Sequence, residues 1–186
     1  IRVEVTIDGD TLVFDFTGSA TEQQGPVNAV QAVTDVSFSV GAGASGLYAN
    51  ARVSEQQRRL ATSLLEPVGL VEWVDNETLI EAVTAVSGSG PAYFFLIFEA
   101  LEEAGKRLGL PADSARRLAL QTGFGAARMA QQSEFEPAQL RRNVTSPNGT
   151  TQAGLEVLMD EQAGLPPLVK ATVAAAADRS RELANG

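Results

Sequence analysis

The sequence predicts a mainly α-helical protein in which a small α/β segment with an N-terminal β-hairpin precedes a bundle of helices. Three observations indicate this fold class. From residue 76 to the end, apolar residues recur at helical spacing. Between residues 41 and 75, two short apolar runs flank one amphipathic stretch. In residues 1–17, apolar and polar residues alternate on both sides of an Asp-Gly turn, which is the strongest short-range signal for a hairpin.

The elements of the first part follow from local patterns. Residues 27–38 have a weak helical pattern, and residues 44–51 and 69–74 read as short strands. The helix between these strands begins after Ser54, because a serine followed three residues later by Gln57 forms a capping box.

The second part is helical throughout. Asn76 is a candidate cap for its first helix, and Ser89-Gly90-Pro91 begins the next, with proline in the first turn where its missing N–H costs nothing. Gly109 suits the end of that helix, and the last helix covers about 165–184. The run from Tyr93 to Leu108 is apolar nearly all round, so it must be buried on most sides. We therefore expect a homodimer or a larger homo-oligomer.

Composition excludes several kinds of chemistry. A net charge of −9, from 14 basic and 23 acidic residues, argues against nucleic acid or an anionic membrane as a partner. The chain has no cysteine and no histidine, which excludes thiolate nucleophiles and Ser-His-Asp triads and leaves no expected metal site. Uninterrupted apolar runs such as residues 92–98 are far shorter than the ~20 residues of a membrane span, and no secretory signal is evident. We expect a cytoplasmic protein with no membrane partner.

The stretch Thr145-Ser146-Pro147-Asn148-Gly149-Thr150-Thr151-Gln152 is the most informative part of the chain. It places three threonines, a serine and a tight turn directly before an apolar-periodic run. The first turn of a helix has free N–H groups, and its dipole favours negative charge, so this loop is a candidate site for a carboxylate or a phosphate. The alternative is an ordinary N-capped surface turn, since Ser, Thr, Asn and Gly are common at helix starts.

A second motif, Gly41-Ala42-Gly43-Ala44-Ser45-Gly46, matches the dinucleotide fingerprint G-x-G-x-x-G. In that fingerprint a helix starts within the glycines and meets the pyrophosphate. Here an extended stretch follows the glycines, and the helix starts only after Ser54. A glycine-rich turn that enters a strand is therefore the favoured interpretation, and a dehydrogenase using this loop is a remote one.

Two motifs together resemble pyrroline-5-carboxylate reductase. They are residues 85–94, with the sequence Ala-Val-Ser-Gly-Ser-Gly-Pro-Ala-Tyr-Phe, and residues 144–151, with the sequence Val-Thr-Ser-Pro-Asn-Gly-Thr-Thr. The resemblance covers residues 41–186. It implies an interleaved helical dimer, with a preceding Rossmann domain that binds NADPH or NADH, and the reduction of 1-pyrroline-5-carboxylate to L-proline in proline biosynthesis.

The resemblance also assigns site residues by position. Ser146, Gly149, Thr150 and Thr151 match the loop that holds the substrate's carboxylate, and Thr151 matches the threonine near the ring nitrogen, which gives it the catalytic role. Pro91 matches the proline that packs on the pyrroline ring, and Ser89 lies in the same loop. Where many members have a second glycine this chain has Asn148, which also tolerates a left-handed backbone.

The N-terminal part departs from the family. The fingerprint of the nucleotide domain is expected some 110 residues before Gly41 by the resemblance, and the chain has only forty residues there. Residues 1–40 resemble instead a fragment of the hydantoinase B and acetone carboxylase alpha-subunit family. We thus expect three parts: 1–40, unrelated to the rest; 41–75, a remnant of a nucleotide-binding domain; and 76–186, the dimerisation and substrate-binding domain.

Two functional hypotheses follow. By the resemblance, the chain is the substrate-binding and dimerisation part of an NAD(P)H-dependent oxidoreductase. It is expected to bind no cofactor and to be inactive alone because the nucleotide-binding half is missing. The alternative is a non-catalytic helical dimerisation module or a chimeric chain. Binding of pyrroline-5-carboxylate or proline separates the two.

Overall fold

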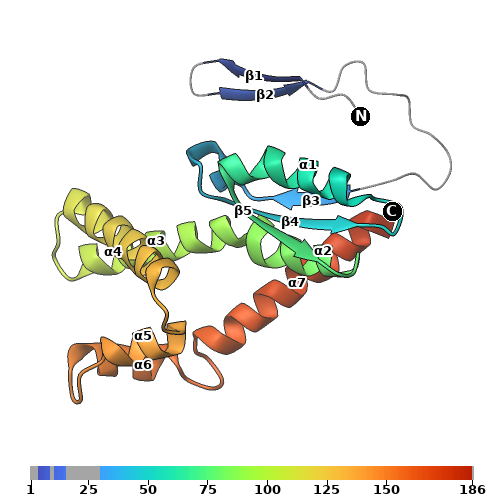
Figure 1. The fold of residues 1–186 in the computed structure, drawn as a ribbon. Coiled ribbons are helices and arrows are strands. Elements are labelled where there is room, and N and C mark those ends of the chain that lie inside the picture. Colours follow the sequence, from blue (N-terminus) through green and yellow to red (C-terminus); the bar gives the residue numbers. More distant parts are fainter. Residues whose placement is uncertain (1–3, 9–10, 16–29, 186) are drawn as a thin grey trace. The chain divides into compact units, whose positions relative to one another are not determined.

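A computed structural model of the 186-residue chain describes residues 4–8, 11–15 and 30–185. These residues belong to two compact units (Figure 1). The first unit comprises the chain up to Pro91 together with the segment from Ala176 onward, and the second comprises Ala92–Ala175.

The expected N-terminal hairpin is confirmed. Strands β1 (Glu4–Asp8) and β2 (Thr11–Asp15) pair antiparallel, with Asp8 opposite Thr11. The two residues between these strands lie outside the described residues.

The central feature of the first unit is a three-stranded sheet in the order β3-β4-β5. Strand β3 (Val30–Thr34) runs antiparallel to β4 (Gly43–Ala49), and β4 runs parallel to β5 (Gly69–Val74). The parallel pair is joined by a crossover through helix α1 (Glu55–Leu65) and the 3-10 turn η2 (Glu66–Val68), as parallel strands require.

The prediction of a weak helix over residues 27–38 is wrong. Within the described part, Val30–Thr34 is a strand and Val36–Val40 forms a 3-10 helix, η1. The β-branched residues of β3 find a ladder partner in β4, which a short apolar run cannot reveal by its own period. The sheet therefore includes residues that precede Gly41, the start of the second expected part.

Asp35 fixes the corner between β3 and η1. Its carboxylate accepts hydrogen bonds from the N–H of Ser37 at 2.7 Å and from the N–H of Ala44 at 3.0 Å. The Asp35 N–H donates to the Ala44 carbonyl. This buried aspartate thus caps the 3-10 helix and ties it to β4.

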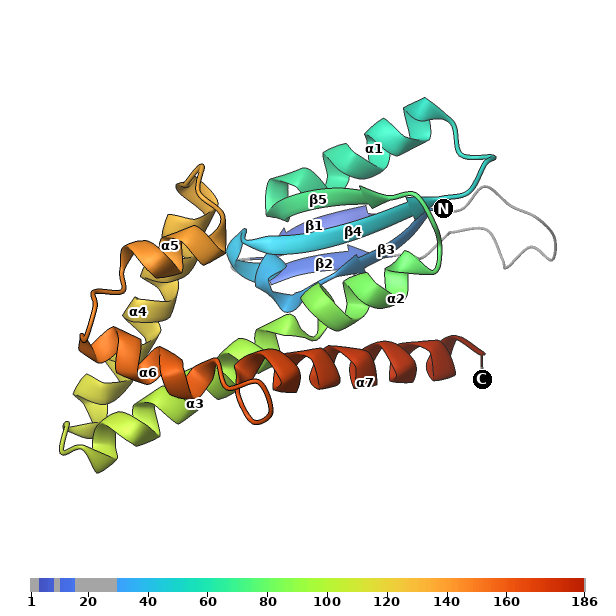
Figure 2. The same ribbon diagram turned by 90° about the horizontal axis from the view of Figure 1, so that it is seen from below.

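Helices cover both faces of the sheet (Figures 1 and 2). On the α1 side, Trp73 of β5 donates its ring N–H to Thr62 at 3.0 Å, and the Arg58 guanidinium lies 4.8 Å from the Trp73 ring centre. Helix α2 (Leu79–Val83) lies on the other face, where Val83 meets Gly46 so closely that a Cβ there would come within 2.4 Å of it. Leu47 of β4, which lies opposite Trp73 in the parallel pair, is the largest fully buried side chain among the described residues.

The helices of the first unit begin only in part where the sequence predicts. The capping box of Ser54 and Gln57 is confirmed. Asn76 is not the cap of its helix, because α2 begins three residues later, at Leu79, with Thr78 at the cap position. The Asn76 side chain instead accepts from the Thr78 N–H and hydroxyl. An asparagine that bonds the backbone two residues on forms a turn in place of a cap.

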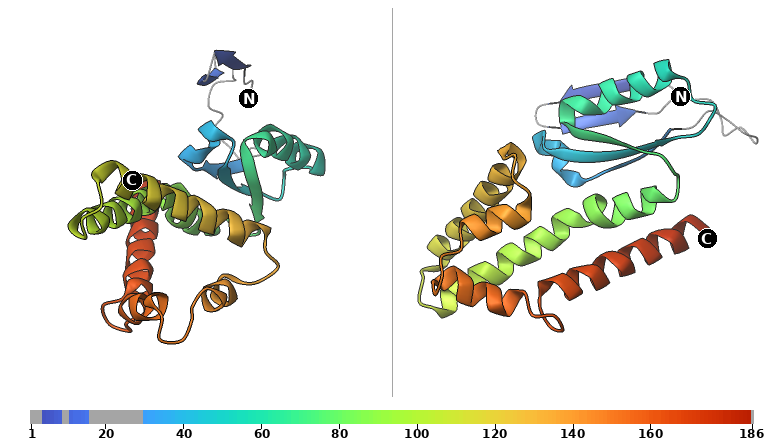
Figure 3. Two further views of the ribbon diagram at one scale, coloured as in Figure 1. Left: turned by 90° about the vertical axis from the view of Figure 1, so that its left-hand side faces the viewer. Right: turned by 60° about the horizontal axis from the view of Figure 1, so that its bottom comes forward.

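Helices α3 (Gly90–Arg107) and α4 (Ala112–Gln132) form the antiparallel pair of the second unit, to which the part of α3 from Ala92 belongs (Figure 3). A Cβ on Gly105 would meet Ala115 at 3.2 Å, and one on Gly123 would meet the Phe98 ring at 2.2 Å, so both glycines permit close helix approach. Gly109 ends α3 with a φ of +95°, as expected of a C-terminal glycine.

Three further helices follow: α5 (Pro137–Asn143), α6 (Thr150–Leu158) and α7 (Leu165–Asn185). The mainly α-helical fold class is confirmed. The end of α7 belongs to the first unit, where Arg181 and Glu81 of α2 form an ion pair at 3.0 Å.

Large apolar side chains remain exposed on several sides of α3. Phe94, Phe95 and Leu96, three successive residues, are 60%, 58% and 65% exposed. The continuous helical run Leu79–Arg107 is long and apolar enough to cross a membrane by length and composition alone. The length of uninterrupted apolar runs does not reveal this stretch, because small and polar residues interrupt the apolar sequence without ending the helix.

Candidate functional site

The residues Ser146-Pro147-Asn148-Gly149 form a tight turn before α6. The Gly149 N–H donates to the Ser146 carbonyl at 3.1 Å and closes the turn. Asn148 has a φ of +57° and is the one non-glycine residue with positive φ among the residues that the structure describes. Proline at the second position and a left-handed residue at the third are typical of a type II turn. The turn directs the chain from α5 into the start of α6.

Gly149 and Gln152 hold this turn against the helix. A Cβ on Gly149 would lie 2.9 Å from the Ser146 hydroxyl oxygen, so the close approach favours glycine. The Gln152 side chain accepts from the Asn148 N–H at 2.8 Å and donates to the Glu156 carboxylate at 3.0 Å. This role of Gln152 was not predicted from the sequence, although a glutamine four residues after Asn148 and four before Glu156 is a usable signal.

The first turn of α6 offers hydrogen-bond donors. The Ala153 N–H donates to the Gly149 carbonyl at 3.2 Å, which leaves the three preceding N–H groups, of Thr150, Thr151 and Gln152, without an acceptor in the described part of the chain. Both threonine side chains are exposed, and within the described residues neither hydroxyl makes a hydrogen bond. Free N–H groups at a helix start together with the helix dipole suit a carboxylate.

This geometry agrees with both interpretations of the loop, the anion site and the N-capped surface turn. The structure brings together Ser146 and Gly149 of the turn with Thr150 and Thr151 of the first turn of α6, all in the second unit. Because Thr150 and Thr151 are exposed, a single loop supplies donors but encloses no ligand.

Ser89 and Pro91 belong to the first unit. Ser89 donates its N–H to the Thr84 carbonyl five residues earlier at 2.8 Å and thereby closes a π-helical turn, Thr84–Gly88. Pro91 is half-buried in the first turn of α3, as its sequence position predicts. π-Helical turns inside α-helices are frequent at functional sites. This π-helical turn was not predicted from the sequence.

The glycines of the G-x-G-x-x-G match do not form a dinucleotide loop. Gly41 ends η1 with a φ of +69°, while Gly43 and Gly46 lie within β4. A Cβ on Gly43 would lie 3.0 Å from the Phe38 backbone. The positive φ accounts for Gly41, and close packing accounts for Gly43 and Gly46. No helix starts among these glycines, and the residues present do not fit a pyrophosphate.

Titratable groups in the second unit have structural roles. The N–H groups of Ala163 and Gln162 donate to the Asp160 carboxylate at 2.7 and 2.9 Å and lower its pKa. On α3, a hydrogen bond from Lys106 lowers the pKa of Glu103 and raises that of Lys106. Across the described ranges there is no group of three His, Cys, Asp or Glu side chains that suits a metal ion.

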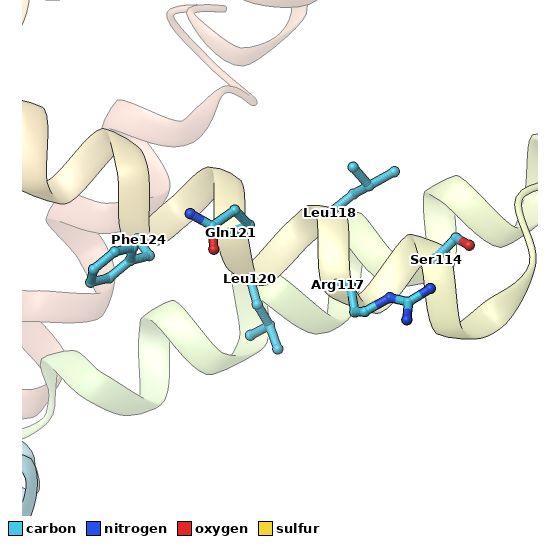
Figure 4. A pocket seen from close by; sticks show the side chains of 6 residues that line it. All are labelled: Ser114, Arg117, Leu118, Leu120, Gln121 and Phe124. Carbon is cyan, nitrogen blue, oxygen red and sulfur yellow. The ribbon is translucent and has the colours of Figure 1, made fainter.

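A hollow along α4 is lined by side chains of that helix alone: Ser114, Arg117, Leu118, Leu120, Gln121 and Phe124 (Figure 4). Leu118 and Leu120 point to opposite sides of the helix in this view. A hollow bounded by one helix has no opposite wall, so it does not form a small-molecule site. It is a partly apolar helix face.

Comparison with known proteins identifies related chains. The model of the family described as pyrroline-5-carboxylate reductase dimerisation matches residues 77–183, and that of hydantoinase B/oxoprolinase matches residues 1–54. The pyrroline-5-carboxylate reductase of Pseudomonas aeruginosa is 56% identical over 142 residues, which are 76% of this chain and 51% of the relative. That of Pisum sativum is 40% identical over 154 residues, 83% of this chain and 55% of the relative.

Solved structures agree with these matches. A pyrroline-5-carboxylate reductase from Coxiella burnetii superimposes with a TM-score of 0.80 at 48% identity and covers 84% of this chain and 57% of its own. The Plasmodium falciparum pyrroline carboxylate reductase with NADP bound has a TM-score of 0.75 at 29% identity and covers 83% and 58%. This chain spans about half the length of the curated relatives it matches. Because the family's model covers more than half of its residues, the chain belongs to the pyrroline-5-carboxylate reductase dimerisation family.

Proposed function

We propose that this chain is the substrate-binding and dimerisation part of a pyrroline-5-carboxylate reductase, which reduces 1-pyrroline-5-carboxylate to L-proline. One observation carries the proposal: the turn of residues 146–149 leads into α6 with three N–H groups free for an acceptor. A cyclic amino acid presents a carboxylate of the size and charge that such a helix start binds.

In this proposal the loop performs two tasks. The free N–H groups and the hydroxyls of Ser146 and Thr150 hold the carboxylate and orient the ring. The Thr151 hydroxyl donates to the ring nitrogen, which makes the neighbouring carbon of the C=N bond a better hydride acceptor. Pro91 packs on the ring, and Ser89 positions the backbone around it. Neither task needs a histidine or a metal ion.

We propose that NADPH or NADH, the hydride donor, is bound by residues that this chain does not supply. NADP is bound in the Plasmodium falciparum relative, whereas the glycines of β4 are engaged in local packing. We therefore expect the chain alone to bind no NADPH or NADH and to have little or no reductase activity. Robust oxidation of NADPH with pyrroline-5-carboxylate contradicts this part of the proposal.

The proposal also includes the oligomeric state of the chain and its division into parts. The dimerisation family supports homo-oligomers, and we propose a homodimer or larger ring, located in the cytoplasm. We further propose three parts, residues 1–40, 41–75 and 76–186, of which the last is sufficient for association and contributes the substrate loop.

Calorimetric titration with L-proline tests the loop. Replacing Thr151 by Val keeps the side-chain shape and removes one donor to the ligand, so the affinity should fall about tenfold or more. Thr172→Val is the matched control, because the Thr172 hydroxyl donates to the Leu168 carbonyl of its own helix and is not in the loop. Equal affinities of Thr151→Val and the unmodified chain would refute the assignment of Thr151.

A non-catalytic dimerisation module is the second candidate function. The exposed apolar faces of α3 and α4 support it as much as they support the first candidate. This candidate predicts that the chain associates and yet binds no proline at millimolar concentration. The same titration, made on protein whose oligomeric state is known from light scattering, therefore decides between the two functions.

A further inference from the structure

The dipeptide Asn148-Gly149 lies in the turn before α6, where Asn148 is exposed and Gly149 is half-buried. We propose that Asn148 is a site of spontaneous deamidation, which adds a negative charge to this loop. The consequence for binding rests on the function proposed above, whereas the modification itself does not.

Three features of the turn support the reaction. Glycine follows the asparagine, so no Cβ shields the backbone nitrogen that must attack. Among the described residues the Asn148 carboxamide makes no hydrogen bond, and its backbone N–H alone is held, by Gln152. The one bond of the Gly149 N–H, to the Ser146 carbonyl, is 3.1 Å long and closes an exposed turn, so its opening uncovers no core.

The reaction needs only water as a co-reactant. The Gly149 backbone nitrogen loses its proton to solvent base and attacks the side-chain carbonyl carbon of Asn148, which forms a C–N bond and a five-membered succinimide. The bond from that carbon to the side-chain nitrogen breaks, and ammonia leaves with a proton from water. A second water then opens the ring at either carbonyl and gives aspartate or isoaspartate. No group is oxidised or reduced, and asparagine is among the thermolabile residues.

The added charge acts on the proposed site in a specific direction. A carboxylate directly before α6 interacts favourably with the positive end of the helix dipole, so the helix is not destabilised. The same charge repels a bound carboxylate at the start of α6, and at separations of several Å this is expected to weaken binding about tenfold. A loss of affinity without a loss of thermal stability therefore distinguishes a charge effect from unfolding.

Peptide mapping of protein aged at mildly alkaline pH tests the modification. Trypsin releases residues 143–170 as one peptide, which holds both Asn148 and Asn143. Asn143 is the internal control, because Val144 follows it and its side chain accepts from Gln139. We expect a gain of about one mass unit at Asn148, since NH is replaced by O, together with isoaspartate.

Asn185-Gly186, at the end of the sequence, falls in a different peptide and provides a chemical reference. Conversion there with none at Asn148 overturns the proposal. Conversion at Asn143 as fast as at Asn148 also overturns it, because the effect of the glycine is then absent.

Two substitutions test the consequence. Asn148→Asp should weaken proline binding about tenfold and leave the melting temperature unchanged or higher. Asn148→Gly keeps a residue that tolerates positive φ and adds no charge, so it should bind as before and gain no mass on ageing. Equal affinity of Asn148→Asp refutes the charge effect. If the unmodified chain binds no proline, the proposed function fails with the binding consequence, and the mass measurement still decides the modification.

Discussion

Gly46 is the position where the contact between the sheet and α2 can be tested most directly. In Gly46→Ala, the new Cβ would lie 2.4 and 2.7 Å from the two methyl carbons of Val83. Carbon atoms that touch without strain are about 3.5 Å apart, so β4 and α2 must separate by about 1 Å. Overpacking of this kind costs about 1–3 kcal/mol.

Alanine also reduces the conformational freedom of the unfolded chain, and this offsets about 0.5–1 kcal/mol of the overpacking cost. We therefore expect Gly46→Ala to lower the free energy of unfolding of the first unit by about 1–2 kcal/mol. Trp73 is the single tryptophan of the chain and lies on β5, beside β4, so its fluorescence in urea reports this unit. A local reporter is needed because a chain with two units need not unfold in one step.

The control for Gly46→Ala is its combination with Val83→Ala. Removal of the two methyl groups makes room for the new Cβ, so the double variant should be more stable than the sum of the two single effects by about 1 kcal/mol or more. An unchanged urea midpoint for Gly46→Ala, or strictly additive effects in the double variant, would show that α2 does not pack on β4 as described.

Two further predictions concern carboxylates that accept backbone N–H groups. Asp35→Ala should lower the free energy of unfolding of the first unit by about 1–3 kcal/mol, because two partly buried N–H groups lose their carboxylate acceptor. Trp73 fluorescence in urea measures this loss, and an unchanged urea midpoint contradicts it. The folded pKa of Asp160 is lowered, so its contribution to stability is present above the unfolded pKa and is lost as the pH falls through the folded pKa. Thermal melts across the acid range should therefore show a smaller loss of stability in Asp160→Asn, and an identical acid dependence would contradict the role of this carboxylate.

Local signals account for much of what the sequence predicts correctly. Ser54 and Gln57 satisfy each other's N–H groups within one turn, so their partners are three residues apart and visible in the sequence. Gly109 ends α3 for an equally local reason, its positive φ. The bounds of β5 are also as expected, because residues 69–74 are apolar apart from Glu72.

The errors occur where the deciding partner is distant. Val30–Thr34 is a strand because β4 supplies the ladder, and the pattern of the segment alone favours a helix weakly. The π-helical turn at Thr84–Gly88 depends on a backbone bond between residues five apart, which no side-chain pattern marks. Tertiary pairing overrides local propensity in the first case, and backbone geometry does so in the second.

The conformation of the candidate site could be predicted from the sequence for a different reason. Its turn is continuous in sequence, so Pro147, Asn148 and Gly149 predict the conformation that the φ of +57° shows. The roles of Ser89 and Pro91 rest on the resemblance alone and stay predictions. The role of Gln152 was not predicted, because its two hydrogen bonds do not belong to a capping box.

The helical run Leu79–Arg107 has two physical explanations, a membrane or a protein partner, and the chain itself favours the second. Charged side chains at the centre of a membrane span are costly, but the charges of this run lie near its ends, at Glu81 and from Glu99 onward. The charge pattern therefore suits either explanation, and the covering of the apolar face decides between them. A partner subunit instead covers apolar side chains such as Phe94 and leaves the charged end in water, and the match to a dimerisation family begins at residue 77, two residues before the run. The apolar surface of α3 is therefore best understood as half of a core that a second copy completes.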